Sequence, residues 1–370
     1  MFIIYALTFT VAKFYDVTYP YAGLINFCLL IVLLFNNVNI PRALMNREAE
    51  IYLLGAVILI AGINLFIVNS GKGAFFVPAN FLLIWYMSDK MDISQRTVRF
   101  FAWTYMAYLL FYLFIAYPRL FTTFENYKYN TNTAATFTIY TMLCAFMLLE
   151  MLDDSSGLLL GLFKVMILLK GFQLALWHRA RGAFVMLILF MIFRYCIPKK
   201  WWKNKVLYVL LLLLATLGSL AFVGLYVYVG KTGANFKLPF FYKEVFSGRE
   251  AIWHELFTLL VNDERPYMLF TGIGTNFELT SFFEKNVHNA MYNFVVIHGL
   301  VVFSGILYFV YKRLWNLRDR IIGNRVALTA MCALMAVFFE SYLDVDLIWA
   351  DYALNLIFLL MVINYGSKCD

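Results

Sequence analysis

Charged side chains are scarce in this chain. Asp, Glu, Lys and Arg make up 14% of its 370 residues, whereas 63% of the residues are hydrophobic. A soluble domain carries about 25% charged residues, so this chain has too little polar surface to cover a globule in water. We therefore predict an all-α, polytopic integral membrane protein rather than a soluble globular domain.

Cysteine and histidine are also sparse, which argues against several kinds of site. The five cysteines form no CxxC pair and no disulfide framework, so we interpret them as small apolar packing residues. The four histidines are dispersed, and no HxxxH, HExxH or DxD pattern stands in an outer loop. The sequence therefore predicts no metal site and no cofactor. A net charge of +8 is typical of membrane loop topology rather than of nucleic-acid binding.

Apolar runs close to the roughly 20 residues that span a bilayer as a helix are frequent. The first run has neither the basic start nor the small-residue cleavage site of a secretory signal, so we expect it to be retained. We predict about 11 to 12 transmembrane helices on this basis. The runs fall at 1–15, 20–38, 51–69, 74–88, 99–116, 134–150, 156–176, 182–197, 206–229, 287–311, 326–343 and 350–364.

The distribution of Lys and Arg predicts which ends of these helices face the cytoplasm. With the N-terminus inside, the cytoplasmic loops receive the basic runs PKKWWKNK at 198–205 and KRLWNLRDRIIGNR at 312–325. The short loops on the other side then hold few cations. Cytoplasmic loops are enriched in Lys and Arg, so we expect both chain ends to lie inside and the start of the run at 287 to face outward.

One long polar insert, 230–286, separates an N-terminal transmembrane bundle (1–229) from C-terminal transmembrane helices (287–370). Within the insert, SGREAIWHEL contains a capping box from Ser247 to Glu250, and apolar residues follow at helical spacing. We predict an amphipathic helix that lies along the outer membrane surface or over a cavity. TGIGTNF then supplies a glycine-rich turn before the next apolar run.

Two arginines on the predicted outer side are candidates for binding an anion. Arg249 stands in the first turn of the amphipathic helix, and Arg181 stands in LALWHRARGAF between two apolar runs, close to Arg179. A guanidinium presents a planar fork of donors that suits a phosphate. The alternatives are a surface arginine that snorkels to the headgroups, for Arg249, and interfacial anchoring beside Trp177, for Arg181.

His288 opens an apolar run at the predicted outer face, directly after the polar insert. Histidine is the usual general base or hydrogen-bond relay near neutral pH. The alternative is a helix-terminal histidine that is hydrogen-bonded to the loop. His298 follows ten residues later and points to another face of a continuous helix, so we interpret it as structural.

The last outer turn, FFESYLDVDLIWADY, gathers four acidic residues, Glu340, Asp344, Asp346 and Asp351. Glu340 and Asp344 share one face if a helix continues through both. They are candidates for a second base, for acceptors of sugar hydroxyls, or for counter-ions of the arginines. We expect Asp346 to lie on a solvated rim.

Taken in order, these motifs resemble the C-terminal signature region of the O-antigen polymerase/ligase superfamily. SGREAIW in the long insert resembles its SGR-x-x-x-W element, FTGIGTN its G-x-G turn, and VHNAMYNFVVIHGLVVF its H-N element at the start of a helix. Upstream, HRARGAF is similar to the S-R-G element, with Ala180 where serine is usual, and YNTNTAATFT resembles the Asn-rich start of an outward-starting helix. The resemblance covers 171–311 in order and spacing.

The resemblance implies a GT-C-like, metal-independent glycosyltransferase whose donor is a polyprenyl-diphosphate-linked glycan, with its one long periplasmic loop containing short helices. It assigns Arg181 and Arg249 to the diphosphate and His288 to the role of the essential histidine. We add Arg179 as a further diphosphate contact and Glu340 as a further catalytic candidate. Three other side chains are expected to contact the glycan: Trp253, Asn289 and Tyr292.

The leading hypothesis is therefore a polymerase of the bacterial inner membrane that joins undecaprenyl-diphosphate-linked repeat units into O-antigen or a related surface polysaccharide, with its active site facing the periplasm. Short length and a Phe-, Tyr- and Asn-rich composition favour this reading. Expected partners are lipid-linked donor and acceptor glycans, membrane lipids and a chain-length regulator protein. The alternatives are a ligase that moves glycan onto lipid A-core or protein, and a polysaccharide flippase or transporter, which predicts inverted repeats and midplane charges.

Overall fold

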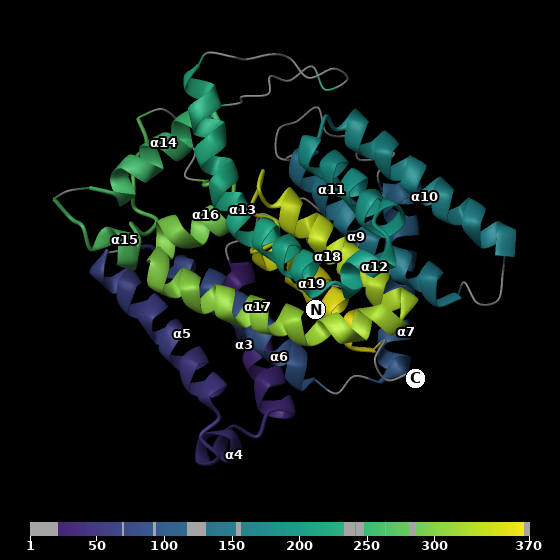
Figure 1. Cartoon of the computed structure of the whole chain (residues 1–370), viewed down its shortest axis with the longest axis horizontal. Helices are drawn as coiled ribbons and strands as arrows, with labels where there is room; N and C mark the ends of the chain where they lie inside the picture. Colours follow the sequence, from purple (N-terminus) through teal and green to yellow (C-terminus); the bar gives the residue numbers. More distant parts are fainter. Residues whose placement is uncertain are drawn as a thin grey trace.

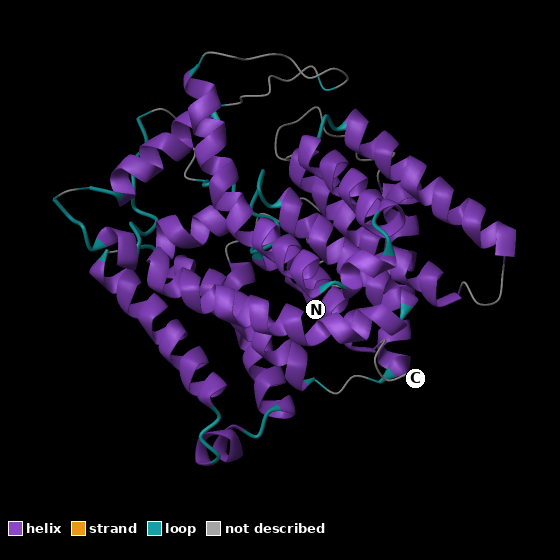
Figure 2. Cartoon of the chain, in the orientation of Figure 1, coloured by secondary structure: helices purple, strands orange, loops and turns teal. Residues whose placement is uncertain are grey.

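The computed structural model describes most of the chain, namely residues 21–68, 70–91, 94–116, 131–152, 157–232, 241, 248–262, 264–280 and 286–365. Within these ranges the regular secondary structure is helical, and turns and loops join the helices (Figure 2). The prediction of an all-α chain is therefore confirmed for the described residues. The first predicted span, 1–15, lies outside them.

Each later apolar run predicted from the sequence contains a helix. In chain order the helices are α3 (Ala22–Asn37), α4 (Ile40–Met45), α5 (Ala49–Ile67), η2 (Lys72–Phe75), α6 (Phe76–Lys90), α7 (Gln95–Phe111), η3 (Tyr112–Ala116), α9 (Thr131–Leu152), α10 (Gly157–Trp177), α11 (Arg181–Met191), η4 (Ile192–Cys196), α12 (Lys199–Lys203), α13 (Lys205–Lys231), α14 (Arg249–Leu260), α15 (Met268–Thr271), α16 (Ala290–Asn293), η5 (Phe294–His298), α17 (Gly299–Gly323), α18 (Arg325–Glu340), η6 (Ala350–Tyr352) and α19 (Ala353–Tyr365).

Six helical stretches in the described part of the chain are long and apolar enough to cross a membrane. They are Ala49–Ile67, Gln95–Phe114, Ala134–Leu152, Gly157–Trp177, Lys205–Lys231 and Ala290–Gly323. Shorter apolar helices in the described part are Ala22–Asn37, Gly73–Ser88 and Ala350–Asn364. The chain thus has the character of a polytopic membrane protein, and its described residues contain fewer full-length spans than the whole sequence predicts.

The centre of the molecule is built from α9 and α18, which pack on each other and on α11, α7 and α19 (Figure 1). Alanines recur along α18 at every third position, and small residues allow neighbouring helix backbones to approach closely. Those alanines, Ala327, Ala330, Ala333 and Ala336, have no exposed surface. The 134–152 part of α9 is likewise 89% buried inside the molecule. The ends of α9 and α18 are therefore held in fixed positions.

The peripheral helices present large apolar side chains away from this core. α5 and α10 form two edges of the molecule in Figure 1, and Phe66 of α5 is 88% exposed while Leu158 of α10 is 83% exposed. Extended apolar surface of this kind on a soluble protein would cause association. It suits contact with lipid.

The helical stretch from α16 to α17 is interrupted, where the sequence predicts a continuous run. The π-helical turn η5 ends at His298, and Gly299 adopts a left-handed φ of 80°. A Cβ at Gly299 would stand 2.1 Å from a backbone oxygen of α15, so only glycine fits. The loop after α15 fills the break, and the amide of Ile273 donates to the carbonyl oxygen of Val296 at 2.7 Å. The predicted glycine-rich turn therefore satisfies the backbone of a broken membrane helix.

His298 lies at this break and is fully buried. Its carbonyl oxygen accepts a hydrogen bond from Nδ2 of Asn64 at 3.1 Å. The predicted geometry, which assumed a continuous helix between His288 and His298, is wrong because His288 precedes α16, which begins at Ala290, and because η5 is π-helical. The structural role expected of the His298 side chain stays a prediction.

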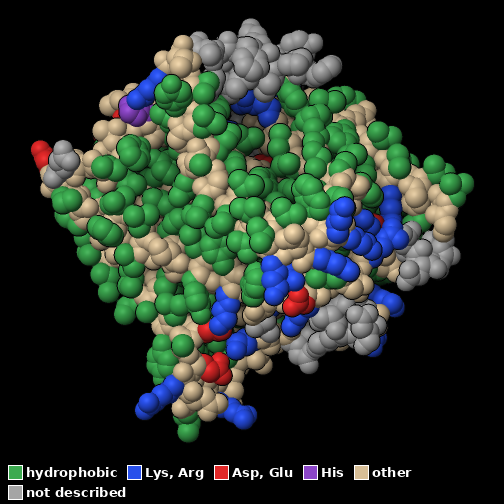
Figure 3. Space-filling model, in the orientation of Figure 1, with side chains coloured by type: hydrophobic (Ala, Val, Ile, Leu, Met, Phe, Trp, Pro, Cys, Tyr) green, Lys and Arg blue, Asp and Glu red, His purple; other side chains and the backbone are tan. Residues whose placement is uncertain are grey.

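Lysine and arginine side chains gather on one side of the molecule, over α12 and the C-terminal end of α17 (Figure 3). α12 exposes Lys199, Lys200 and Lys203 on this side, which we call the basic side. α18 begins here at Arg325, immediately after α17. Its other end, at Glu340, is about 22 Å away at a rise of about 1.5 Å per residue.

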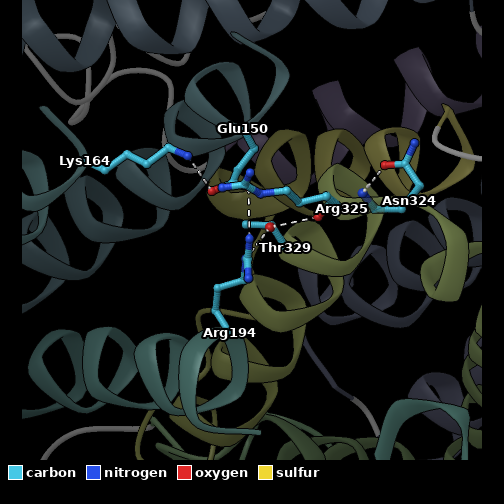
Figure 4. Close-up of polar contacts among 7 residues, drawn as sticks. Glu150, Lys164, Arg194, Asn324, Arg325 and Thr329 are labelled. Carbon is cyan, nitrogen blue, oxygen red and sulfur yellow. Dashed lines mark hydrogen bonds and ion pairs between the residues drawn. The ribbon is translucent and has the colours of Figure 1, made fainter. Parts of the chain in front are cut away.

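A buried ion-pair cluster lies at the basic side, where α9 ends (Figure 4). The side chain of Glu150 has no exposed surface and pairs with Lys164 at 2.9 Å and with Arg194 at 3.1 Å. Arg325 approaches the same carboxylate at 2.7 Å, and Nε of Arg194 donates to Oγ1 of Thr329 at 2.7 Å. Three cations thus compensate for the burial of one carboxylate. The cluster ties α9, α10, η4 and α18 together.

The three segments predicted from the sequence are interleaved rather than separate. α14, which belongs to the 230–286 insert, packs on α13 of the N-terminal segment, and α18 of the C-terminal segment packs on α9 and α11. A cavity between these helices can therefore draw residues from all three segments.

Candidate functional site

A cavity of about 300 Å³ lies among the ends of α9, α11, α13, α14 and α18. It is at the end of α18 opposite the basic side. Arg181 and Arg249, which are far apart in the sequence, both reach its wall, and their charges are close enough to interact. Among the described residues, the wall consists of Asn132, Thr136, Ala180, Arg181, Gly182, Val185, Phe222, Tyr226, Arg249, Glu340, Leu343 and Asp344.

The RARG segment forms the start of α11. Ala180 is the N-cap and Arg181 is the first residue, and no side chain caps this helix. A Cβ on Gly182 would stand 2.4 Å from Oε1 of Glu340, so the absence of a side chain leaves the space that the carboxyl group occupies. The segment therefore supplies two neighbouring features, the cation Arg181 and the space beside Gly182 that the Glu340 carboxyl group occupies.

The helix that carries Arg249 starts later than the predicted capping box requires. Its N-cap is Gly248, with a φ of 86° and no side-chain cap, and Ser247 lies outside the described residues. Glu250 is therefore the second residue of α14, and the predicted capping box lies partly outside the described residues because it depends on the Ser247 side chain. The left-handed turn at Gly248 directs the chain so that Arg249 enters the first helical turn at the cavity wall.

A helix forms where the sequence predicts one, but Phe257 on α14 is 55% exposed, and the amphipathic character of α14 stays a prediction. One face of α14 is buried against the rest of the protein, while His254 is exposed. The buried residues are Ile252, Trp253, Leu256 and Leu260.

Trp253 fixes α14 in place one turn after Arg249. Its ring lies 5.0 Å from the ring of Tyr226 and 6.1 Å from that of Phe222, both on α13. Its Nε1 donates to the carbonyl oxygen of Val287 at 2.6 Å. The fully buried indole thus connects α14 both to α13 and to the segment that carries the candidate histidine.

His288 is positioned by its neighbour Asn289. Oδ1 of Asn289 accepts from the amide of Tyr292 at 2.9 Å and from Oγ of Ser219 at 2.8 Å, and Nδ2 donates to the carbonyl oxygen of Tyr342 at 3.0 Å. Asn289 therefore caps α16 and holds it against the turn after α18. His288 itself adopts a φ of 52°, a conformation that few non-glycine residues take and that often marks functional sites.

Asp344 joins the histidine to the arginine pair. Its Oδ1 lies 3.7 Å from Nδ1 of His288, and its Oδ2 lies 3.9 Å from a guanidinium nitrogen of Arg249. Burial disfavours the charged form, but the contacts with His288 and Arg249 outweigh it and hold the pKa of Asp344 below its usual value. Asp344 is therefore a carboxylate at neutral pH. His288 does not line the cavity itself, but it lies beside Asp344, which does.

The sequence does not place Asp344 in this central position. α18 ends at Glu340, and Ser341 to Leu343 form a turn, so the shared helical face predicted for Glu340 and Asp344 is wrong. Both residues nevertheless reach the cavity, because the turn folds back over the end of the helix. The cluster of acids in FFESYLDVDLIWADY identified this region from the sequence. It did not indicate which of the four acids meets His288.

Glu340 and Asp346 are buried beside one another. Glu340 has no exposed surface and Asp346 is 2% exposed, so the prediction that Asp346 lies on a solvated rim is wrong. The physical reason is that Val345 and Leu347, on either side of it, pack inward and carry Asp346 with them. The phenol of Tyr352 donates to Asp346.

The remaining predicted residues do not line the cavity. Arg179 is exposed, with a φ of 50°. Trp253, Asn289 and Tyr292 are buried, and the hydroxyl of Tyr292 donates to the carbonyl oxygen of Trp253 at 3.1 Å. Contacts of these four residues with a diphosphate or a glycan stay predictions. In the structure, the three buried residues position Arg249 and His288.

No three or more His, Cys, Asp or Glu side chains among the described residues are arranged as metal ligands. Metal independence of the reaction stays a prediction. Comparison with protein families, with curated proteins and with solved structures finds no match to this chain.

Proposed function

We propose that this chain is an inverting glycosyltransferase that polymerises undecaprenyl-diphosphate-linked oligosaccharide repeat units into O-antigen or a related surface polysaccharide. The observation that carries the proposal is the convergence of Arg181 and Arg249 on one cavity, next to the pair formed by His288 and Asp344. The three basic residues are those that the motif resemblance assigns to the reaction.

The two arginines suit the leaving group of this reaction. When the bond between the anomeric carbon and the lipid diphosphate breaks, negative charge develops on the diphosphate oxygens. Two guanidinium groups fixed in one cavity stabilise that charge without reorganising. Asp344 lies 3.9 Å from Arg249, which is longer than a direct hydrogen bond and leaves donors of the guanidinium for a phosphate.

The pair of His288 and Asp344 suits the proton transfer. The acceptor hydroxyl attacks the anomeric carbon from the face opposite the diphosphate, so that a new glycosidic bond forms as the old bond breaks and the configuration inverts. Nε2 of His288 takes the hydroxyl proton, while Asp344 faces Nδ1 and stabilises the imidazolium.

We place the enzyme in the bacterial inner membrane, with the cavity at the periplasmic face. The supporting observation is that the exposed lysines of α12 lie at the end of the helix bundle opposite the cavity, as the enrichment of cations in cytoplasmic loops requires. A GT-C-like architecture, lipid-linked donor and acceptor glycans, and an association with a chain-length regulator belong to the same proposal.

Complementation of a deletion strain tests the proposal. Arg249→Ala and His288→Ala should leave single repeat units on lipid, with losses of about 10²–10³ in chain-forming activity. Arg265→Ala and His254→Ala remove the same side chains from exposed positions and should restore long chains.

Other outcomes separate the competing functions. Long chains in both Arg249→Ala and His288→Ala would refute the assignment. Loss of all capped glycan, with lipid-linked polymer intact, would indicate a ligase. Accumulation of repeat units on the cytoplasmic side would indicate a flippase.

A further inference from the structure

Glu340 and Asp346 form a pair of buried acids with an unusual lack of partners. Neither carboxyl oxygen of Glu340, nor Oδ2 of Asp346, meets a donor among the described residues. The two side chains lie within hydrogen-bonding reach of one another if one of them carries a proton. Two carboxylates cannot both stay charged at such a distance away from water.

The charged groups around the pair do not remove this conflict. Asp344 adds a third negative charge on the same turn, and Arg249 of α14 already faces Asp344 at 3.9 Å. Arg181 of α11 shares the cavity with Glu340. His288 faces Asp344 rather than the pair.

The remaining titratable groups beside the pair are phenols. They are Tyr140 of α9 and Tyr352 of η6. The Tyr352 hydroxyl donates to Asp346 and so supports its charge. Burial nevertheless raises the pKa of Asp346 well above its usual value, and the charges of Glu340 and Asp344 act in the same direction.

We propose that Glu340 and Asp346 share one proton, so that Glu340 faces the cavity as a neutral carboxylic acid and contacts a sugar hydroxyl, while His288 alone takes the proton of the acceptor. The sugar contact rests on the proposed glycosyl transfer. The shared proton does not, because it rests on the burial of the two acids and on their lack of donors.

The position of Glu340 fits a contact with sugar. Glu340 is one of the residues that line the cavity, and its buried Oε1 lies against Gly182 at the start of α11. A neutral carboxyl both donates and accepts hydrogen bonds, as a sugar hydroxyl requires, and it does not repel the diphosphate held by the arginines. Asp346 has no place in the cavity wall. It is a positioning residue that keeps Glu340 in the neutral form.

Infrared spectroscopy of the purified protein tests the shared proton without any substrate. At neutral pH, Glu340→Gln and Asp346→Asn should each remove the same carbonyl band of a protonated carboxylic acid. The double variant should remove no more band area than either single variant. Asp351→Asn, a control at another buried acid, should leave that band unchanged. Separate bands for the two residues, or no band sensitive to Glu340→Gln, would overturn the proposal.

Chain formation then tests the role of Glu340. Glu340→Gln keeps a neutral hydrogen-bonding group and should retain activity within about fivefold, whereas Glu340→Ala should lose about 10²-fold. If Glu340 were the base, the glutamine variant would be as inactive as the alanine variant. In that case the assignment of His288 as sole base fails even where the infrared result holds.

The infrared test and the chain-formation test can fail independently of one another. If the protein shows the predicted infrared band but no glycosyl transfer, the proposed function is refuted and the shared proton is still supported. If Asp346→Asn does not fold, Asp346→Glu replaces it in the infrared test. This variant retains a carboxyl group and should retain the band, so loss of the band in Asp346→Glu would contradict the proposal.

Discussion

Nε1 of Trp253 donates a 2.6 Å hydrogen bond to the carbonyl oxygen of Val287, the residue before His288. This bond joins the helix that presents Arg249 to the segment that presents the histidine. The groups proposed for leaving-group stabilisation and proton transfer, Arg249 and His288, are therefore held relative to one another by a residue that is not among those lining the cavity.

Trp253→Phe is predicted to lower activity while the protein still folds. Phenylalanine keeps most of the contact with α13 but leaves the Val287 carbonyl oxygen without its donor, at a cost of about 1–3 kcal/mol. Misplacement of reacting groups by about 1 Å can cost about 10²-fold in rate, so we expect a loss of at least about tenfold in chain formation. Trp201→Phe is the matched control, because Trp201 is 48% exposed on α12. Equal activity of the two variants would show that the bond does not set the geometry.

Gly182→Ala is predicted to inactivate the site with little effect on the fold. The new Cβ would lie 2.4 Å from Oε1 of Glu340, so the carboxyl group must move away from the start of α11. We expect a loss of about 10²-fold in chain formation, with unfolding of the purified protein near that of the wild type. Gly161→Ala in α10 meets nothing within 4 Å and should be neutral or slightly stabilising. Full activity of Gly182→Ala would contradict the described placement of Glu340.

The helices could be predicted from the sequence because burial and lipid contact both require apolar runs. The hydropathy pattern carries no information on backbone conformation, however. It did not predict the break at Gly299, which depends on a φ of 80° and on a neighbouring backbone oxygen. It also ended the run at 311, whereas α17 continues through charged residues to Gly323.

The site was predicted in part for a similar reason. Local motifs identified Arg181, Arg249 and His288, because each stands in a short pattern that can be read by itself. Asp344 and Asp346 stand in a single acidic turn, and only the fold of that turn distinguishes the carboxylate that meets His288 from the one that is buried against Glu340. The partners of Glu150 were likewise invisible, since they come from three other helices.

Glu150→Gln is predicted to destabilise the protein strongly without touching the cavity. The side chain is fully buried and faces three cations, so a neutral amide leaves their charges uncompensated at a cost of about 3–5 kcal/mol. Unfolding of the purified protein in detergent measures this. Glu48→Gln removes a partly exposed carboxylate that pairs with Lys90 at 3.4 Å, and it should cost at most about 1 kcal/mol. A similar small effect in both variants would show that the cluster does not hold the helices together.

The depressed pKa of Asp344 predicts a specific loss of stability in acid. Burial opposes its ionisation, yet His288 and Arg249 hold the folded-state pKa below the usual value, which is about 3.9 in an unfolded chain. The ionised carboxylate therefore stabilises the fold. That contribution is complete above the unfolded pKa and is lost as the pH falls through the lower folded pKa.

Asp344→Asn should remove this part of the pH dependence. Thermal unfolding in detergent between neutral pH and pH values below the usual pKa should show the wild type losing more stability than the variant on acidification. Asp319→Asn is the control, because the Asp319 side chain is 83% exposed and should give the wild-type pH profile. Parallel profiles for the wild type and Asp344→Asn would mean that His288 and Arg249 do not hold Asp344 ionised. The proposed stabilisation of the His288 imidazolium by Asp344 would then lose its electrostatic basis.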